Sequence, residues 1–360
     1  MVRVAINGYG RIGRVAHRII LEKYSDRIEV VGINTGSTTD LQGWLYLLKY
    51  DSAYGPLRGH SLSIEPSEKH AVSPEGEKER PHFQDFLNTG HFVIDEQKIP
   101  IFAEKDASVL PWKSLKVDVV IESTGHLRSE EKLNSHLQAG AKKVVLSAPA
   151  KEGNIQTVVL SVNEKDYVGG QLISNASCTT NCITPVAQVM HNAFGIEKAM
   201  MTTIHAYTSD QKLQDSGHAD YRRARAAGQN IIPTTTGATS AAAKAMPELS
   251  DALGGLAVRV PVITGSLSDF TFLLKKDVTK DEVNAAFEQA SQKDEYRGIL
   301  RATNDPLVSS DVIGDSHSAI IDLSLTQVIG GNMVKVIAWY DNEYGYANRL
   351  VEEVLMVGEN

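Results

Sequence analysis

A polar run around a cysteine carries the strongest chemical signal in this sequence. The run stands directly before an apolar stretch with helical spacing, and it reads Ser174-Asn175-Ala176-Ser177-Cys178-Thr179-Thr180-Asn181-Cys182. A cysteine at the start of a helix has a stabilised thiolate, because the helix dipole lowers the thiol pKa. A buried structural thiol would not need so many hydroxyl and amide neighbours. The pattern predicts that Cys178, which leads the helix, is the nucleophile of the pair.

A nucleophilic cysteine usually works with a histidine that exchanges protons with it. Eleven histidines occur, and most stand in predicted helices or loops where a solvated side chain is the default. His205 differs, because it lies near the end of the predicted strand 199–207 and precedes a polar segment. We therefore expect His205 to be the partner of Cys178, although spacing alone does not bring the two together. Two cysteines are too few for a zinc site with the usual ligand spacing, so no metal is expected.

A glycine motif near the amino terminus predicts a dinucleotide site. It follows an apolar strand at 2–7, opens a helix, and reads Gly8-Tyr9-Gly10-Arg11-Ile12-Gly13. A second strand at 30–34 completes a βαβ unit. The glycines let the backbone approach a pyrophosphate, the helix start offers free N–H groups to it, and Arg11 would add a donor. This context makes the motif more specific than its spacing alone.

The strand end that usually selects the cofactor lacks its acid. A carboxylate about 20 positions after the glycines normally accepts a hydrogen bond from the adenosine ribose. Here the strand ends in Asn34-Thr35-Gly36-Ser37-Thr38. The sequence therefore lacks both an acceptor that favours NAD and a negative charge that repels the 2′-phosphate of NADP. The choice between NAD and NADP stays open.

Arginines and threonines form a third group, which suits phosphate. The group consists of Arg222-Arg223-Ala224-Arg225, Thr234-Thr235-Thr236-Gly237 and Arg259. Arginine forks and threonine hydroxyls hold phosphate well, and an arginine inside an apolar strand needs a partner. The alternatives are a solvated charge run and a structural ion pair. Together with a reactive thiol and a dinucleotide site, the phosphate interpretation is favoured.

The order of predicted elements indicates an α/β protein with two domains. Apolar strands at 117–121 and 143–146 flank a helix at 129–139, which is typical of a Rossmann doubly wound, mainly parallel sheet. Longer alternating strands follow at 199–207, 257–274 and 320–340, the last broken by Gly330-Gly331, with a helix near 280–291. We expect a dinucleotide-binding domain at 1–177 and a catalytic α+β domain with a mainly antiparallel sheet at 178–342. A carboxy-terminal helix within 343–360 would return to the first domain.

Length, charge and cysteine content limit the kind of protein. A chain of 360 residues is long enough for two cores, and a net charge of −8 disfavours unaided binding to nucleic acid or anionic lipid. The two cysteines are poorly spaced for a disulfide, no apolar run reaches the ~18 residues of a membrane span, and strand 2–7 leaves no room for a signal peptide. We expect a cytoplasmic protein without membrane or nucleic-acid partners. Residues 64–90, rich in proline and charge, are expected to form a surface excursion.

Motifs along nearly the whole chain resemble those of the phosphorylating glyceraldehyde-3-phosphate dehydrogenase family. In order they are Asn7-Gly8-Tyr9-Gly10-Arg11-Ile12-Gly13-Arg14, Lys49-Tyr50-Asp51-Ser52, Glu122-Ser123-Thr124-Gly125, Ser147-Ala148-Pro149-Ala150-Lys151, Ser174 to Asn181, Ile232-Pro233-Thr234-Thr235-Thr236-Gly237-Ala238 and Trp339-Tyr340-Asp341-Asn342-Glu343. The resemblance implies oxidation of glyceraldehyde 3-phosphate to 1,3-bisphosphoglycerate through a cysteine thiohemiacetal and thioester. Hydride would pass to NAD or NADP, and inorganic phosphate would attack the thioester.

The resemblance also implies roles for single residues. Cys178 resembles the nucleophile and His205 the histidine that activates it, while Thr208 and Arg259 would hold the substrate's terminal phosphate. The residues that resemble the receivers of inorganic phosphate are Ser177, Thr179, Thr236, Gly237 and Arg223. Those that resemble the cofactor-binding residues are Gly8, Gly10, Arg11, Ile12, Gly13, Asn34, Thr35, Ser123, Thr124, Asn342, which would orient the nicotinamide amide, and Tyr346 close by.

The sequence departs from the family pattern at two places and leaves alternatives open. Thr35 stands where an NAD-selective acid is expected, and segment 64–90 is longer than usual. Erythrose-4-phosphate dehydrogenase shares the cysteine, although the intact Thr234-Thr235-Thr236-Gly237 motif favours the phosphorylating reaction. A cofactor-binding scaffold without activity is a further alternative. The resemblance implies a homotetramer with residues 210–229 near subunit contacts, while a glycolytic or a biosynthetic direction stays open.

Overall fold

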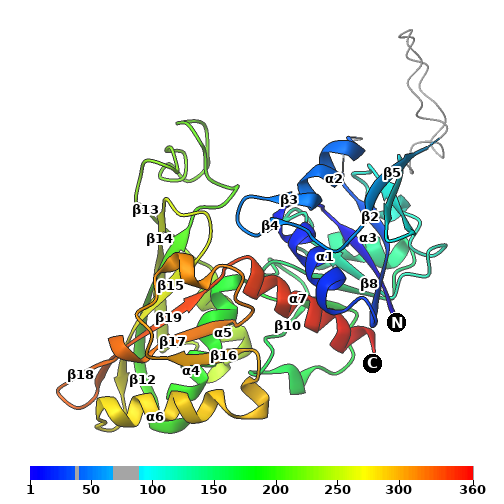
Figure 1. Cartoon of the computed structure of the whole chain (residues 1–360). Helices are drawn as coiled ribbons and strands as arrows, with labels where there is room; N and C mark the ends of the chain where they lie inside the picture. Colours follow the sequence, from blue (N-terminus) through cyan, green and yellow to red (C-terminus); the bar gives the residue numbers. More distant parts are fainter. Residues whose placement is uncertain (37–39, 68–88, 360) are drawn as a thin grey trace. The chain divides into compact units, whose positions relative to one another are not determined.

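The computed structural model describes residues 1–36, 40–67 and 89–359, which divide into two compact units (Figure 1). Unit 1 consists of Met1–Gln156, Val168–Asn175 and the chain from Leu350 onward. Unit 2 consists of Thr157–Tyr167 and Ala176–Arg349.

Unit 1 is built on a nine-stranded, mainly parallel sheet. In sheet order the strands are β10 (Gln156–Thr157), β11 (Leu172–Ser174), β9 (Lys143–Leu146), β8 (Val119–Glu122), β1 (Val2–Asn7), β2 (Ile28–Asn34), β7 (Gln97–Phe102), β6 (Gly90–Ile94) and β5 (Leu62–Pro66). Neighbours from β11 to β7 pair in parallel, whereas β6 pairs antiparallel with both β7 and β5. The other elements are α1 (Arg11–Lys23), α2 (Leu41–Lys49), α3 (Glu130–Gln138) and the short hairpin β3 (Tyr50–Asp51) and β4 (Gly55–Pro56).

The predicted strand, glycine turn, helix and strand within 2–34 are confirmed. β1 lies in the middle of the sheet, and this explains its almost uninterrupted apolar sequence. Helix α1 buries Val15, Ala16, Ile19 and Ile20 along one face. Asn7 at the end of β1 pairs in register with Asn34 of β2 and with Glu122 of β8. The carboxyl ends of these three strands therefore lie side by side, where a doubly wound sheet binds its ligand.

Unit 2 contains a mixed, mainly antiparallel sheet of eight strands. In order they are β13 (Ile232–Thr234), β14 (Leu253–Val260), β12 (Ile196–Ala206), β15 (Ser266–Leu274), β19 (Met333–Tyr340), β17 (Ala319–Asp322) and β16 (Leu300–Thr303), and β18 (Gln327–Ile329) also pairs with β19. The helices are α4 (Cys178–Phe194), α5 (Ala238–Ala245) and α6 (Lys280–Ser291), and α7 (Tyr344–Gly358) starts in this unit. Side chains from α4, α5 and α6 pack against β12, β15 and β19 in one core, so the helices cover one face of the sheet (Figure 1).

Two predicted strands are wrong in extent. The prediction of one strand over 257–274 is corrected to β14 and β15, which lie on opposite sides of β12. β14 ends at Val260 directly before Pro261, because proline cannot donate to a strand ladder. Gly265 then has a φ of +88°, and a Cβ there would lie 2.2 Å from the Ser309 carbonyl oxygen. The predicted segment 320–340 breaks at Gly330-Gly331 as expected, between β18 and β19, and it is divided once more, between β17 and β18.

The predicted surface excursion at 64–90 lies largely outside the described residues, which omit 68–88. Its two ends belong to β5 and β6, which pair antiparallel from Leu62 with Ile94 to Pro66 with Gly90. Among the described residues, no helix combines the length and the apolar character that a membrane crossing requires.

Candidate active site

Cys178 is the first residue of α4, as predicted from the sequence. Ser177 caps this helix, because its Oγ accepts a hydrogen bond from the Thr180 N–H at 3.1 Å. Ala176 has a φ of 52°, in the left-handed region that favours glycine. The chain is thus strained just before the nucleophile, a placement that is frequent at functional sites.

The structure brings Cys178 and His205 together. Cys178 Sγ lies 3.3 Å from His205 Nε2, and His205 is the penultimate residue of β12. His205 Nδ1 lies 2.7 Å from the Ala206 carbonyl oxygen, to which it donates. Because a carbonyl can only accept, the imidazole proton sits on Nδ1, and the lone pair of Nε2 faces the thiol. A neutral His205 can therefore take the proton of Cys178.

Burial opposes charge on both members of this pair. It raises the pKa of the Cys178 thiol, although the positive charge of Arg259 and hydrogen bonds at Thr179 act in the other direction. Burial, together with the charge of Arg259, lowers the pKa of His205 to about 3. The sequence predicted a lowered pKa for the Cys178 thiol, and this prediction is wrong. The pKa is raised, because desolvation outweighs the favourable charges. Both shifts favour the neutral thiol and the neutral imidazole.

Arg259 lies beside this pair on β14, in register with His205 on β12. Its Nη1 donates to the Ala206 carbonyl oxygen at 3.2 Å and to Thr208 Oγ1 at 3.3 Å. Its Nε is buried without a hydrogen-bond partner, and within the described ranges no carboxylate pairs with this guanidinium. The structural ion pair that the sequence left open for Arg259 is thus not found among the described residues. An uncompensated guanidinium next to Thr208 is suited to an anion.

Hydroxyl groups line the other side of the nucleophile. Thr179 Oγ1 lies 3.0 Å from the Tyr340 hydroxyl, which lies 2.8 Å from Thr203 Oγ1. The Tyr340 ring meets His205 edge to face at a centroid distance of 6.0 Å. Burial raises the pKa of Tyr340, so its hydroxyl keeps its proton. Tyr340 therefore fixes both Thr179 and the His205 ring.

The predicted inorganic-phosphate residues stand at the starts of α4 and α5 and on a neighbouring loop. Gly237 precedes this helix, and Thr236 Oγ1 accepts from the Ala238 N–H at 3.1 Å. Thr180 of α4 donates to the Ala238 carbonyl oxygen at 3.3 Å, which ties the starts of α4 and α5 together. Arg223 reaches the same motif through Thr234, at 3.0 Å, and is also paired with Asp210 at 2.7 Å.

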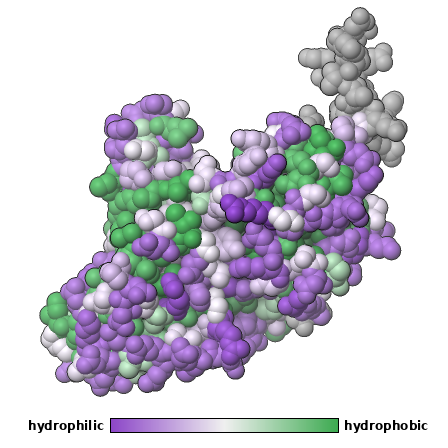
Figure 2. All heavy atoms as spheres, in the orientation of Figure 1, coloured by the Kyte–Doolittle hydropathy of each residue, from purple (hydrophilic) through white to green (hydrophobic). Residues whose placement is uncertain are grey.

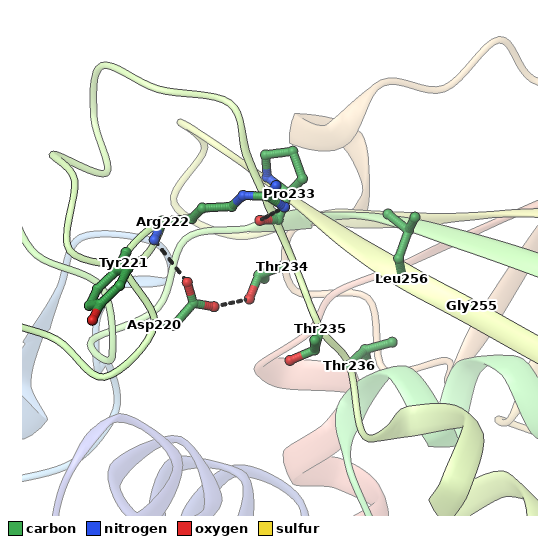
Figure 3. Close-up of a pocket in the computed structure, with 9 residues that line it drawn as sticks. All are labelled: Asp220, Tyr221, Arg222, Pro233, Thr234, Thr235, Thr236, Gly255 and Leu256. Carbon is green, nitrogen blue, oxygen red and sulfur yellow. Dashed lines mark hydrogen bonds between the residues drawn. The ribbon is translucent and has the colours of Figure 1, made fainter.

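An open cavity of about 610 Å³ lies between residues 220–222 and the threonine motif (Figure 3). Asp220, Tyr221 and Arg222 line one side of it, and the threonine motif with Gly255 and Leu256 lines the other. Asp220 joins the two sides, since its carboxylate accepts from Thr234 Oγ1 at 2.6 Å and from the Arg222 N–H at 2.8 Å (Figure 3).

Asn342 is held in one orientation directly after β19. Its Oδ1 accepts from Ser266 Oγ at 2.7 Å and from Thr264 Oγ1 at 3.3 Å. With Oδ1 occupied in this way, the NH₂ group is the side of the amide that remains to donate. The hydroxyl of Tyr346 donates to the Ala176 carbonyl oxygen at 3.2 Å.

In unit 1, the strand ends enclose a cavity of about 590 Å³. Of the predicted cofactor residues, it is lined by Gly8, Gly10, Asn34, Thr35, Ser123 and Thr124. Arg11, Ile12 and Gly13 do not line it, and the Arg11 guanidinium donates to Asp51 at 2.6 Å. The predicted side-chain donor to a pyrophosphate is thus engaged with a carboxylate.

The glycines of the motif fit a dinucleotide. A Cβ at Gly8 would lie 2.5 Å from the Thr124 nitrogen, and one at Gly13 would lie 2.3 Å from the Gly8 carbonyl oxygen. A Cβ at Gly10 would meet nothing within 4 Å, so the backbone before α1 is open to a ligand. No side chain of the described residues caps the start of α1, and no acidic residue stands in its first turn. The N–H groups there suit a pyrophosphate.

A buried network under this cavity was not predicted from the sequence. Asn7 Nδ2 donates to the Glu122 carboxylate at 2.5 Å, and Asn34 Nδ2 donates to Asn7 Oδ1 at 2.6 Å. Trp112 Nε1 donates to His136 Nδ1 at 3.0 Å, so the proton of His136 sits on Nε2, 3.0 Å from Glu122. Other lining residues that sequence reasoning missed are Asn7, Tyr9, Gly36, Trp44, Glu104, Lys105, His126 and Leu127. Placement after a sheet strand could have identified Glu104, but the strand before it was not predicted.

Comparison with known proteins connects both cavities to one family. Residues 2–78 and 79–130 match the family model described as glyceraldehyde 3-phosphate dehydrogenase, NAD binding domain, and residues 177–342 match the model of its C-terminal domain. The chain is 46% identical to a glyceraldehyde-3-phosphate dehydrogenase of Streptomyces coelicolor, over 99% of this chain and 98% of the relative. It is 47% identical to one of Mycobacterium tuberculosis, over 100% and 99%, and 45% identical to one of Borreliella burgdorferi, over 98% of each.

The matched ranges include Cys178, His205 and the glycine motif, and the relatives match almost from end to end. This chain therefore belongs to the glyceraldehyde 3-phosphate dehydrogenase family of oxidoreductases.

Proposed function

We propose that this protein oxidises glyceraldehyde 3-phosphate in the presence of inorganic phosphate and NAD or NADP, with 1,3-bisphosphoglycerate as the product. The observation that carries the proposal is the contact of 3.3 Å between Cys178 Sγ and His205 Nε2, with Arg259 beside it. Unit 1 would bind the dinucleotide and unit 2 would carry the catalysis, the roles expected of domains 1–177 and 178–342, although residues 157–167 and 343–349 belong to unit 2.

The first step is attack of the Cys178 sulfur on the aldehyde carbon. The thiol proton moves to His205 Nε2, whose lone pair faces it, and then to the carbonyl oxygen, which gives a thiohemiacetal. Arg259 and Thr208 would hold the terminal phosphate of the substrate, because they present a guanidinium and a hydroxyl without a carboxylate partner among the described residues.

In the next step His205 accepts the hydroxyl proton of the thiohemiacetal, and a thioester on Cys178 remains. The dinucleotide, when bound, supplies the hydride acceptor. In unit 1 it would be held by the backbone of residues 11–13 at the start of α1 and by Gly8, Gly10, Asn34, Thr35, Ser123 and Thr124. Asn342 would donate to the nicotinamide amide. Tyr346 would support the turn at Ala176.

Inorganic phosphate would then attack the thioester carbon and release the Cys178 thiolate, which regains its proton from His205. Thr179, Thr236 and Gly237 supply hydroxyl and backbone donors on the side where α4 and α5 start, and Ser177 supports them as the helix cap. Arg223 would join this site once an anion competes with Asp210 for its guanidinium.

The test is the rate of cofactor reduction with glyceraldehyde 3-phosphate and phosphate, with erythrose 4-phosphate run in parallel. Replacing His205 by Asn should lower turnover by about 10²–10⁴-fold, the usual worth of a general acid–base group. The matched control is His191→Asn, at the far end of α4, which should leave the rate unchanged. Faster turnover of erythrose 4-phosphate would favour the related dehydrogenase, and binding without any burst of reduced cofactor would favour a scaffold.

A further inference from the structure

The adenosine end of the cavity in unit 1 has no acid on β2, as the sequence indicated. Thr35 occupies that position, and its hydroxyl and N–H both donate to the Phe102 carbonyl oxygen, at 3.0 and 2.8 Å. These bonds turn Thr35 toward β7, the neighbouring strand. A carboxylate that distinguishes NAD from NADP must therefore come from another strand end.

Glu104, which follows β7, lines the same cavity. The Asn34 side chain fixes it against the end of β2 with two hydrogen bonds. Asn34 Nδ2 donates to the Glu104 carbonyl oxygen at 2.8 Å, and the Glu104 N–H donates to Asn34 Oδ1 at 2.9 Å. The backbone of Glu104 is thereby held beside the position where a doubly wound sheet usually presents its acid.

The carboxylate of Glu104 is also fixed. Its Oε1 accepts from the backbone N–H groups of Lys105 and Asp106, at 2.7 and 2.9 Å. Among the described residues, the hydrogen bonds of this carboxylate all go to Oε1, and Oε2 therefore remains as an acceptor for a ligand. Lys105 also lines the cavity with an opposite charge, but its exposed side chain has no ion pair or hydrogen bond in the described part of the chain.

We propose that Glu104 determines cofactor specificity in this protein, in the place that Thr35 has lost, and selects NAD over NADP. This inference rests on the proposed use of a dinucleotide. The Glu104 carboxylate accepts from the 2′-hydroxyl of an adenosine ribose and repels a 2′-phosphate. Lys105 would attract the 2′-phosphate, but a carboxylate held by two backbone donors acts at a fixed position, whereas a solvated ammonium is screened and mobile.

Calorimetric binding of NAD⁺ and of NADP⁺ to the full chain tests the proposal without relying on activity. Wild type should bind NAD⁺ at least about tenfold more tightly, and Glu104→Gln should reduce this ratio by about tenfold, mainly through tighter binding of NADP⁺. The charge-matched control is Glu131→Gln, an exposed position on α3, which should leave the ratio unchanged. Adding Thr35→Asp to Glu104→Gln should restore the preference for NAD⁺, and this rescue also shows that the variant is folded.

Each outcome gives a decision. A ratio that Glu104→Gln changes by less than about twofold, or a wild-type preference for NADP⁺, overturns the role of Glu104. If wild type binds neither dinucleotide, the proposed function itself fails, and this result is distinguishable from an unchanged ratio with normal binding. A wild-type preference that weakens as salt is added supports selection by charge.

Discussion

The reactivity of Cys178 depends on residues from three strands of unit 2. His205 on β12 lies within reach of its proton, Arg259 on β14 supplies positive charge, and Tyr340 at the end of β19 contacts the imidazole ring. Burial favours the neutral form of both the thiol and the imidazole. This arrangement protects the thiol at rest, because the thiolate is the reactive form.

We predict that Arg259→Gln raises the pKa of the Cys178 thiol further and also raises the pKa of His205. The charge of Arg259 favours the thiolate and disfavours the imidazolium, and its removal reverses both effects. Since the thiolate fraction grows as pH rises through the thiol pKa, inactivation by iodoacetamide should accelerate with pH in both proteins. At neutral pH it should be about tenfold slower in the variant.

Iodoacetamide is neutral and carries no phosphate, and its rate therefore reports on the thiol rather than on substrate binding. Arg301→Gln is the control, because Arg301 pairs with Asp315 away from Cys178 and its loss should not move the pH profile. An unchanged profile in Arg259→Gln would contradict the electrostatic role of Arg259.

At the residue scale, the sequence predicted those groups whose chemistry shows in their type. Cys178, His205 and Arg259 stand out because a thiol before a helix, a histidine at a strand end and an arginine in an apolar strand are unusual. Tyr340 and Glu104 were missed as side chains of the sites, because their roles arise only from strand pairing between distant segments. The direction of the thiol pKa was also missed, since burial cannot be read from the polar neighbours in the sequence.

Among the elements, the parallel core of unit 1 was predictable and the edges of the sheets were not. The βαβ unit at 2–34 has continuous apolar strands and a helical period, whereas β5, β6 and β7 have mixed sequences near a sheet edge. The strand predicted at 257–274 failed because alternation continues through Pro261 and residues 261–265, where proline and a glycine with positive φ end the ladder.

Helix α7 contains a buried acid that should limit stability. Glu353 is 0% exposed, both of its carboxylate oxygens lack a hydrogen-bond partner within the described residues, and burial raises its pKa well above the usual range. The folded state therefore binds a proton that the unfolded state releases. The pH-dependent part of its cost is absent below its unfolded pKa and grows as pH rises toward the folded value.

We predict that Glu353→Leu raises the free energy of unfolding at pH 8 by about 1–3 kcal/mol, the usual cost of an unpartnered buried polar group. The gain should shrink as pH falls toward 4. Thermal unfolding of both proteins from pH 4 to pH 8 measures the difference. Glu352→Gln is the neighbouring control, since Glu352 is partly buried and bonds to Tyr24. A gain that does not depend on pH would contradict the assignment to Glu353 ionisation.

At the scale of the molecule, unit 2 exposes apolar side chains on the sheet face opposite its helices. Met200 is 63% exposed although its neighbours Ala199 and Met201 are buried in the core, as strand alternation requires. The register places Leu256 of β14 and Met333 of β19 on the same face as Met200. Figure 2 shows apolar surface on this unit around β13 and β14 and near β18. The same face has an apolar cavity of about 370 Å³ lined by Ile204, Leu267 and Trp339.

An exposed apolar face is typical of a protein interface, and chains of a single type usually form symmetric homo-oligomers. We therefore predict that light scattering gives wild type the molar mass of four chains, as the family resemblance implied. The assembly of Met200→Glu should dissociate at protein concentrations at least about a hundredfold higher than those at which the wild-type assembly dissociates. The reason is that burial of an unpaired carboxylate costs several kcal/mol. Val168→Glu is the control, since Val168 is 90% exposed in unit 1 and carries the same change of charge.

A monomeric wild type, or equal dissociation of the two variants, would show that this face does not hold the chains together. If Met200→Glu dissociates and also loses turnover, the assembly supports the active site; if turnover persists, each chain is active alone.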